Sequence, residues 1–475
     1  MHPEGTPWSG RRIGTMLCAA LLACVGACGG GDTRTGGIQG SGSPVASSAV
    51  GAITGFGSIF VNGIEYGTSG AQISIDDEAG TEALLRVGQI VTIRGTLNED
   101  GVTGTATSVA FITDVRGPVA QVDAAAGTFR VLGQTVRVTD ETLFDENIPS
   151  ASLEGLASGM MVEVSGFPDA SGKILASRVD LSAAGAALQV KGVVQGLDAT
   201  ARTFRLNDLT VDYQNIAPDG TLADSGTVVV WGNLAAQTGR LEATRVQLQG
   251  PTATANEHGR LSGIITSFTS DADFIVNGQR IATDTNTQFV LQGMTLGANV
   301  FVNVQGTFNA SGVLVASRVE AKRKTSSRVR GIVEDVSAAS NTLRVLGVTA
   351  TANPSTSFRD KSSEHLRTLR LADIRTGDYV EIRGTPREGG GLDAALIERD
   401  RPEQAAYLQG VAENVAEPNF TVLGVRVATT PDTQFLGGGA SRFFSEAPGQ
   451  VVKVRGSLQS DAFVADRVQV VRNGP

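Results

Sequence analysis

Short runs of alternating apolar and polar residues dominate this chain, and the same succession of runs returns six times. In the second copy, residues 128–131 place Phe129 and Val131 on one face and Arg130 on the other. A period of two is typical of a half-buried strand. Later in the same copy, residues 149–159 have the Ser cap and the Gly stop of one or two helical turns.

The order of elements in this copy is strand, strand, strand, short helix, strand, strand. That is the order of an OB-type barrel, for which we expect closure by pairing of the fifth strand with the first. Asn62-Gly63 and Asn277-Gly278 stand after strand two in two other copies, and Asn-Gly is a strong hairpin signal. The predicted fold is all-β: a tandem array of six small five-stranded OB-like barrels with a short helix between strands three and four.

A fixed period sets the domain organisation. Self-similarity of this kind outranks local propensity when a fold is predicted. A Gly that ends a short strand opens each copy, with a mean spacing of 71 residues: Gly55, Gly117, Gly192, Gly263, Gly331 and Gly410. The predicted boundaries are 1–27 for a signal peptide, 28–49 for a flexible tether, and 50–114, 115–182, 188–249, 258–321, 328–400 and 406–472 for repeats 1 to 6.

Two recurring motifs connect the copies. Most copies carry a Gly-x-x-Val-x-Val/Ile-x-Gly strand, as in residues 88–95 and 159–166. Four copies close with an Ala-x-Arg-Val strand, at residues 176–179, 243–246, 316–319 and 465–468. Together with a Thr-x-Phe element such as Thr142 and Phe144, this pattern resembles a bacterial repeat, the domain-of-unknown-function family 5666, over roughly residues 50–471. The resemblance implies extracytoplasmic proteins, often lipoproteins, and brings no known activity or ligand.

Three copies depart from that pattern. Ser108 replaces the Arg in the first, the fourth strand of the third is one residue short, and residues 395–398 replace the closing motif in the fifth. These departures affect the expected strand ends of those copies.

The N-terminal segment predicts where in the cell the protein is located. Residues 16–27 are apolar and number 12, whereas a membrane-spanning helix needs about 20, so they are typical of a secretory signal. They end in Val25-Gly-Ala-Cys28, which resembles the lipobox of bacterial lipoproteins and implies that Cys28 becomes the lipidated N-terminus. Cys24 is a competing site, and an ordinary signal peptide is the alternative. Residues 29–49 are rich in Gly and Ser and predict the tether. We expect an outer-membrane lipoprotein that faces the periplasm or the outside.

Composition narrows the possible chemistry. All three cysteines lie within the first 28 residues, which excludes a disulfide or a Cys-based metal site in the folded part. The net charge of −9 argues against nucleic acid as a partner. His258 and His365 have no partner in a ligand spacing, and no Gly-x-Ser-x-Gly elbow accompanies them. We therefore expect no catalytic residues, no cofactor, no metal and no enzymatic activity.

Carboxylates and arginines form the remaining candidates. The carboxylates at residues 76–78, 140–141 and 145–146 lack the EF-hand spacing and predict solvated loops, with Ca²⁺ as the alternative. Arginines on the outward faces of strands two and three are speculative ligand-binding residues, because that face of OB-type barrels binds oligonucleotides or oligosaccharides: Arg130, Arg137, Arg205, Arg344 and Arg426. Outward aromatics are scarce, which favours a solvated face. The fifth-strand arginines at positions 178, 245, 318 and 467 predict packing or cross-strand pairing.

These patterns favour a non-enzymatic, lipid-anchored cell-envelope protein that presents an array of interaction domains. Its expected partners are the membrane, through the lipid, and an unidentified protein or polysaccharide. The alternative is a carbohydrate- or anion-binding lipoprotein that uses the outer barrel faces, and a hydrolase is the third class.

Overall fold

The structure is a computed structural model that describes residues 44–250, 254–291, 293–322, 327–387, 390–436, 438–459 and 462–471. The chain divides into two units, residues 1–42 and 43–475, and the second is described below. The predicted signal peptide, Cys28 and most of the predicted tether lie outside the described residues.

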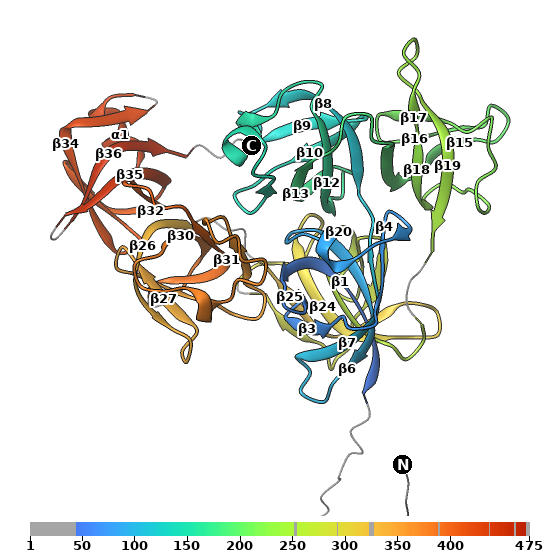
Figure 1. Ribbon diagram of the computed structural model, residues 1–475, viewed down its shortest axis with the longest axis horizontal. Coiled ribbons are helices and arrows are strands. Elements are labelled where there is room, and N and C mark those ends of the chain that lie inside the picture. The colour runs from blue at the N-terminus through green and yellow to red at the C-terminus, as the bar shows by residue number, and fades with distance from the viewer. Residues whose placement is uncertain are drawn as a thin grey trace, which may run out of the picture. The chain divides into compact units, whose positions relative to one another are not determined.

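The second unit is all-β, and its strands form three sheets that each contain a closed five-stranded barrel plus further strands. Figure 1 shows the barrel of repeat 2 with its five strands labelled. These strands are β8 (Val115–Asp123), β9 (Thr128–Val131), β10 (Gln134–Arg137), β12 (Met161–Pro168) and β13 (Ile174–Leu181).

The barrel closes differently from our expectation. β13 does not pair with β8: it runs parallel to β10 and antiparallel to β12, and β12 pairs with β8. The antiparallel ladders β8–β9 and β9–β10 complete the cycle. The prediction that strand five closes onto strand one is therefore wrong, because strand four occupies that edge of strand one.

The other repeats supply strands in the same order. Repeat 1 contains β1 (Val45–Gly55), β2 (Ile59–Val61), β3 (Ile64–Gly67), β6 (Ile90–Leu97) and β7 (Thr103–Phe111). Repeat 3 contains β14 (Leu188–Val193), β15 (Gln195–Asp198), β16 (Thr203–Leu206), β17 (Leu209–Asp212), β18 (Thr227–Leu234) and β19 (Leu241–Gln249). Repeat 4 contains β20 (His258–Ser270), β21 (Asp273–Val276), β22 (Gln279–Ala282), β24 (Phe301–Phe308) and β25 (Leu314–Ala321).

The last two repeats follow the same scheme. Repeat 5 contains β26 (Ser327–Ser337), β27 (Thr342–Val345), β28 (Val348–Thr351), β30 (Tyr379–Pro386) and β31 (Leu392–Asp400). Repeat 6 contains β32 (Ala406–Ala416), β33 (Asn419–Val422), β34 (Val425–Leu436), β35 (Val451–Gln459) and β36 (Ala462–Val470).

Helices are fewer than the sequence pattern predicted. Within the described ranges the one α-helix is α1 (Ala440–Glu446) in repeat 6. Short 3-10 turns stand in repeats 1, 2 and 5, namely η1 (Glu82–Leu84), η2 (Pro149–Ala151), η3 (Leu153–Gly155) and η4 (Leu371–Asp373). The described parts of repeats 3 and 4 contain no helix. Segments this short form too few hydrogen bonds to repay helix nucleation.

A short strand that the sequence analysis missed follows strand three and runs parallel to strand five. It is β4 (Gln72–Ile75), β11 (Leu143–Phe144), β23 (Gln288–Val290) or β29 (Ser357–Asp360) in repeats 1, 2, 4 and 5, and the end of β34 in repeat 6. In repeat 1 it also pairs with β5 (Glu78–Ala79).

One threonine side chain fixes this strand in four repeats. The Thr356 hydroxyl donates to the carbonyl of Ala394 at 2.7 Å and accepts from the Asn353 backbone amide at 2.8 Å. The same hydroxyl-to-carbonyl bond, at 2.6–2.7 Å, recurs in repeats 2, 4 and 6 as Thr142–Ala176, Thr287–Ala316 and Thr433–Ala465. The Thr and the Ala of the repeated motif are therefore two ends of one hydrogen bond.

The second Gly of the strand-four motif marks a β-bulge in all six repeats. At Gly166 the register to β13 shifts, and an added Cβ would lie 2.4 Å from the Leu175 carbonyl oxygen. The corresponding separation is 2.0–2.3 Å at the other five positions, Gly95, Gly232, Gly306, Gly384 and Gly456. Bulges bend a strand, and this one lets strand four turn around a small barrel.

The opening Gly has a different role. Gly117 pairs with Val162 of β12, and an added Cβ would lie 2.7 Å from the side chain of Leu132. In repeat 1 the residue with this pairing is Gly51, opposite Val91, so the choice of Gly55 as the opening Gly is wrong. Gly55 instead ends β1 beside β2.

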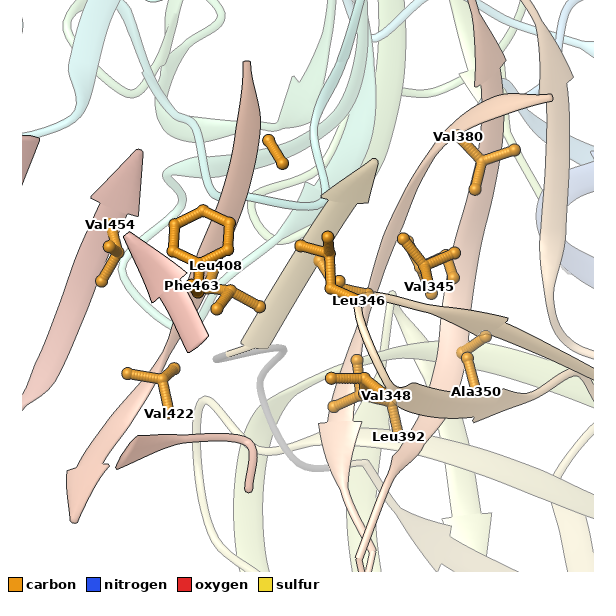
Figure 2. Packing of buried hydrophobic residues seen from close by; sticks show 14 of the residues in the cluster. Val345, Leu346, Val348, Ala350, Val380, Leu392, Leu408, Val422, Val454 and Phe463 are labelled. Carbon is orange, nitrogen blue, oxygen red and sulfur yellow. The ribbon is translucent and has the colours of Figure 1, made fainter. Parts of the chain in front are cut away.

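Two pairs of repeats share a hydrophobic core. One cluster of buried side chains extends from Val115 in repeat 2 to Val246 in repeat 3, and another from Val329 in repeat 5 to Val468 in repeat 6. Figure 2 shows Leu346 of repeat 5 on the side of its barrel that faces Leu408 and Phe463 of repeat 6. Repeats 1 and 4 have two distinct clusters: that of repeat 1 also includes Leu143 of repeat 2 and Leu396 of repeat 5, and that of repeat 4 packs against Val50 of repeat 1.

Strand one joins each pair. β8 pairs antiparallel with β14, with Val115 opposite Val190, and β26 pairs antiparallel with β32, with Val329 opposite Leu408. All four residues stand two positions before the opening Gly, so both pairs have the same local pseudo-twofold arrangement. Repeats 1 and 4 meet instead through a parallel ladder between β1 and β20.

Replacing the bulge glycine tests the close backbone approach. Gly166→Ala should lower the free energy of unfolding by about 1–3 kcal/mol or more, because the new methyl group meets a backbone oxygen that cannot move independently. Urea unfolding of the full chain measures this change. Gly297→Ala is the control, since no atom lies within 4 Å of a Cβ there, and an equal loss in both variants would contradict the interpretation.

Replacing a shared-core residue tests the pairing. Val164 is fully buried in the cluster of repeats 2 and 3, so Val164→Asp should expose both repeats to limited proteolysis while repeats 5 and 6 stay protected. Val193→Asp is the control, because Val193 is 46% exposed. Cleavage confined to repeat 2 would show that repeats 2 and 3 unfold independently and contradict their shared core.

Candidate functional site

The five arginines proposed as ligand-binding residues lie in four different repeats. Arg130 pairs with Asp208 and donates to the Gly133 carbonyl at 3.1 Å, and Arg344 pairs with Glu334 at 3.0 Å. Arg426 donates to Asn419 Oδ1 at 3.4 Å. The side chains of Arg137 and Arg205 make no hydrogen bond or ion pair with any described residue, and the Nε of Arg137 is buried. No hydrogen bond among the described residues joins two of these five arginines.

Two of the predicted loop carboxylates, Asp76 and Asp140, bind side chains of other repeats. Asp76 of repeat 1 binds Arg116 of repeat 2 and accepts from Gln189 of repeat 3 at 2.8 Å. Asp140 of repeat 2 accepts from Gln409 of repeat 6 at 2.9 Å. Asp76 and Asp140 therefore connect repeats, while residues 77, 78, 140, 141 and 146 are exposed, as the prediction of solvated loops requires. No cluster of three metal-ligating side chains is present among the described residues.

Three of the four fifth-strand arginines contact a neighbouring strand, as the sequence predicted, and Arg178 is packed and pairs within its own strand. Arg178 is buried, binds Asp180 and donates to the Val87 carbonyl of repeat 1 at 3.1 Å. Arg318 donates to Gln288 Oε1 at 2.7 Å, and Arg467 donates to Gln434 Oε1 at 3.2 Å. Arg245 lies over the Trp231 ring, with its guanidinium carbon 4.5 Å from the ring centroid.

Tyr379 and Tyr407 of repeats 5 and 6 both contact one arginine side chain. The guanidinium of Arg330 lies 5.2 Å from the ring centroid of Tyr379 and 5.5 Å from that of Tyr407. The Tyr379 hydroxyl donates to the Ala405 carbonyl, and burial, only partly offset by Arg330, raises the pKa of Tyr379 to about 12. The tyrosines of repeats 5 and 6 therefore join these repeats rather than form an outward stacking surface.

Repeat 5 holds the densest group of buried charges. Glu381 is almost fully buried and lies against Arg328 and Arg383. Burial acts to raise the pKa of Glu381, but Arg383 and Arg328 outweigh it and lower that pKa to about 2. The pKa of Asp360 also falls to about 2, because hydrogen bonds from Arg399, Ser362 and Leu366 outweigh burial. Both carboxylates are therefore ionised at neutral pH.

These charges also connect repeat 5 with its neighbours. Arg383 donates to the Asp140 carbonyl, and Arg359 donates to the Phe144 carbonyl at 3.0 Å, both in repeat 2. Arg367, in the segment between β29 and β30 of repeat 5, lies over the Phe56 ring of repeat 1 with its guanidinium carbon 3.8 Å from the ring centroid, and it donates to the Leu85 carbonyl at 3.0 Å. This segment therefore attaches repeat 5 to repeat 1.

A cavity of about 150 Å³ lies where residues of repeats 1, 2, 4 and 5 come together. Its apolar lining includes Leu143, Phe167, Phe301 and Leu396. Its polar lining includes Asn62, Ser177, Ser262, Asn303, Ser355 and Ser357. Among these polar residues, the sequence pattern singled out Asn62 alone, as part of a turn. No shared sequence signal identifies the others, since they come from three repeats.

Comparison with protein-family models connects these repeats with known sequences. The domain of unknown function DUF5666 matches residues 48–110, 116–180, 262–320, 330–398 and 409–469, which make up more than half of the chain. The chain belongs to this family. Its third repeat is not among the matched segments.

Two solved structures show weak similarity. One is a multidomain protein with nucleic acid binding domains from Streptococcus pneumoniae TIGR4, at 11% identity and a TM-score of 0.14, covering 46% of this chain and 73% of the other. The second is Drosophila Unr CSD456, at 14% identity and a TM-score of 0.11, covering 41% of this chain and 88% of the other. Similarity at these scores carries no argument about function. None of the curated proteins compared with the chain matches it. The described residues contain no helix long and apolar enough to cross a membrane.

The lowered pKa values predict an acid-sensitive repeat 5. A carboxylate with a depressed folded-state pKa contributes stability above its unfolded-state pKa and loses it as pH falls through the folded one. For Asp360 and Glu381 that window runs from about 4.5 down to about 2. The urea midpoint of repeat 5 should fall across this window, and Glu381→Gln should reduce the midpoint at pH 7 while flattening the fall.

A matched control distinguishes these buried groups from surface carboxylates. Asp273 pairs with Arg280 on an exposed surface, so Asp273→Asn should leave the pH profile unchanged. An unaltered midpoint for Glu381→Gln at pH 7 would contradict a stabilising role for the buried network.

Proposed function

We propose that this chain is a non-enzymatic, lipid-anchored cell-envelope protein that presents an array of β-barrel domains as an interaction surface. The proposal rests on one observation: the residues that recur in each repeat have structural roles. The Thr, Ala and Gly of the motif hold the backbone of each copy, as at Thr356, Ala394 and Gly384. Because the repeated positions are structural, the differences between copies lie on their surfaces, which suits a set of binding domains on one tether.

We extend the barrel architecture to all six repeats. In repeats 1, 4, 5 and 6 the ladders between strands follow the strand order 1-2-3-5-4-1, as in repeat 2. In repeat 3 the first strand is divided into β14 and β15, which pair with β18 and β16 respectively. A chain of six related barrels offers many independent faces at a small cost in sequence length.

The membrane anchor rests on the sequence Val25-Gly-Ala-Cys28 and on the Gly-rich residues that follow it. Gly29 stands where an Asp would favour retention at the inner membrane, so the proposed location is the outer membrane, facing the periplasm or the outside.

The second candidate function is binding of a carbohydrate or an anion on the outer barrel faces. Arg137 and Arg205 favour it, since their side chains have no charged partner within the described part of the chain. Arg130 and Arg344 argue against binding of a ligand on these faces, because each already pairs with a carboxylate. A hydrolytic activity has no constellation of side chains to support it within the described ranges.

Replacing Cys28 tests the anchor. Cys28→Ala should abolish incorporation of labelled palmitate and move the protein from the detergent phase to the aqueous phase of a detergent partition, since one acylated cysteine supplies the anchor. Cys24→Ala is the control and should retain both label and detergent partition.

The same strains test the interaction role. Crosslinking in intact cells should attach the anchored chain to a defined envelope component, and the Cys28→Ala protein should lose that adduct. Palmitate incorporation into Cys28→Ala would contradict the anchor, and the absence of any adduct with the wild-type chain would contradict the interaction role.

A further inference from the structure

The cavity between repeats 1, 2, 4 and 5 has walls that hydrogen bonds hold in place. Asn62 Nδ2 donates to the Val50 carbonyl at 2.9 Å and to the Arg260 carbonyl at 3.2 Å, so it joins repeats 1 and 4. The Ser262 hydroxyl lies 2.6 Å from Asn62 Oδ1. Ser177 of repeat 2 donates to the Gly88 carbonyl of repeat 1 at 2.6 Å. A site with fixed walls loses little conformational entropy when a ligand binds.

One side of the lining is apolar. The rings of Phe167 and Phe301 pack edge to face with centroids 5.1 Å apart, and they bring repeats 2 and 4 together at the cavity. Leu143 and Leu396 add aliphatic surface. Such a wall suits the carbon–hydrogen face of a ring rather than a fully hydrated ion.

Polar groups with unused capacity stand among these apolar residues. Asn303 contacts Ser262 through Oδ1 at 2.6 Å, while its Nδ2 makes no hydrogen bond with another described residue. The hydroxyls of Ser355 and Ser357 also make none within the described ranges. These three groups can donate to, or accept from, hydroxyl groups of a ligand.

We propose that this cavity binds a single neutral sugar ring. A cavity of about 150 Å³ matches the size of one six-membered ring. Hydroxyl and amide groups beside an apolar wall fit a molecule with hydroxyls at its edge and carbon–hydrogen bonds on its face. Among the described residues of the lining, Lys322 is the one cation and Glu141 the one carboxylate, so these residues give the site no excess charge that would select an anion. The inference deepens the carbohydrate alternative and places the site between repeats instead of on the outer faces.

The test uses the full chain purified in a detergent without a sugar headgroup. Glucose, galactose and N-acetylglucosamine are each offered at about 10 mM, since one small ring buries too little surface to bind much more tightly than the millimolar range. Saturation-transfer NMR should show transfer from the protein to at least one of them. Inorganic phosphate is titrated in parallel by the chemical-shift changes of the protein.

Two variants locate the signal. Ser357→Phe fills the cavity without removing a side-chain hydrogen bond to any described residue, and it should abolish the transfer. Gln434→Phe introduces the same ring at the corresponding strand position of repeat 6, directly after its motif threonine, and should leave the transfer intact.

Three results would overturn the proposal: no transfer to any of the three sugars, transfer that persists in Ser357→Phe, or binding of phosphate in place of sugar. Each of these leaves the palmitate and crosslinking results unaffected, so failure of the sugar site is distinguishable from failure of the anchored-array proposal.

Discussion

Each barrel depends on a point where two backbones approach so closely that no side chain fits between them. At Gly384, an added Cβ would lie 2.1 Å from the Asp393 carbonyl oxygen, and the ladder between strands four and five shifts register there. The shift bends strand four: the whole strand pairs with strand five along one edge, and the ladder with strand one along the other edge ends at Gly384. Opposite Gly384 on strand five lies Ala394, whose carbonyl accepts a hydrogen bond from the Thr356 hydroxyl. This bond fixes the short strand on the other edge of strand five. One bulge and one buried hydroxyl therefore define how the barrel curves and where it closes.

Barrels this small are marginal by themselves, because a domain of about 60 residues buries only about 60% of its unfolded surface. The chain compensates by joining repeats. Repeats 2 and 3, and repeats 5 and 6, share continuous cores through strand one, and Leu346 reaches from one barrel toward the next (Figure 2). Charged contacts then add specificity: Arg116 meets Asp76 of repeat 1, Glu163 of its own repeat and Gln189 of repeat 3. Breaking such a buried group leaves an unpaired charge, so it discriminates strongly against wrong pairings.

Local patterns in the sequence predicted the local structure well. Alternation at Phe129 and Val131 correctly placed a strand with both side chains buried, and Asn62-Gly63 correctly marked a turn, with φ of 53° and 75°. The strand of Leu143 and Phe144 was missed because two residues are too few to show a period. Its signal was Thr142, whose buried hydroxyl explains why the motif contains a threonine.

Contacts between repeats could not be predicted in the same way. Period-two alternation says which face of a strand is apolar, but it does not say which edge pairs with another repeat. Asp76 and Arg116 look like ordinary surface charges until the fold brings them together. The cavity shows the same limit, since Asn62, Asn303 and Ser357 belong to three repeats and share no spacing. A candidate ligand site of this kind exists only in the assembled chain.

The parallel ladder between repeats 1 and 4 has a consequence for assembly. Residues 47–50 of β1 pair with residues 258–261 of β20, so about two hundred residues separate the two edges. An uncovered strand edge is a template for wrong pairing. Until repeat 4 has folded, this edge of β1 has no partner from β20, and contacts of such large sequence separation form slowly. The residues of β1 in this ladder limit that risk because three of the four are small: Ser47, Ser48 and Ala49 lie opposite residues 258–260, and Val50 is the one larger apolar residue. Small side chains at the joint permit close packing with repeat 4 once it arrives, while they give an open edge little hydrophobic surface with which to bind another chain.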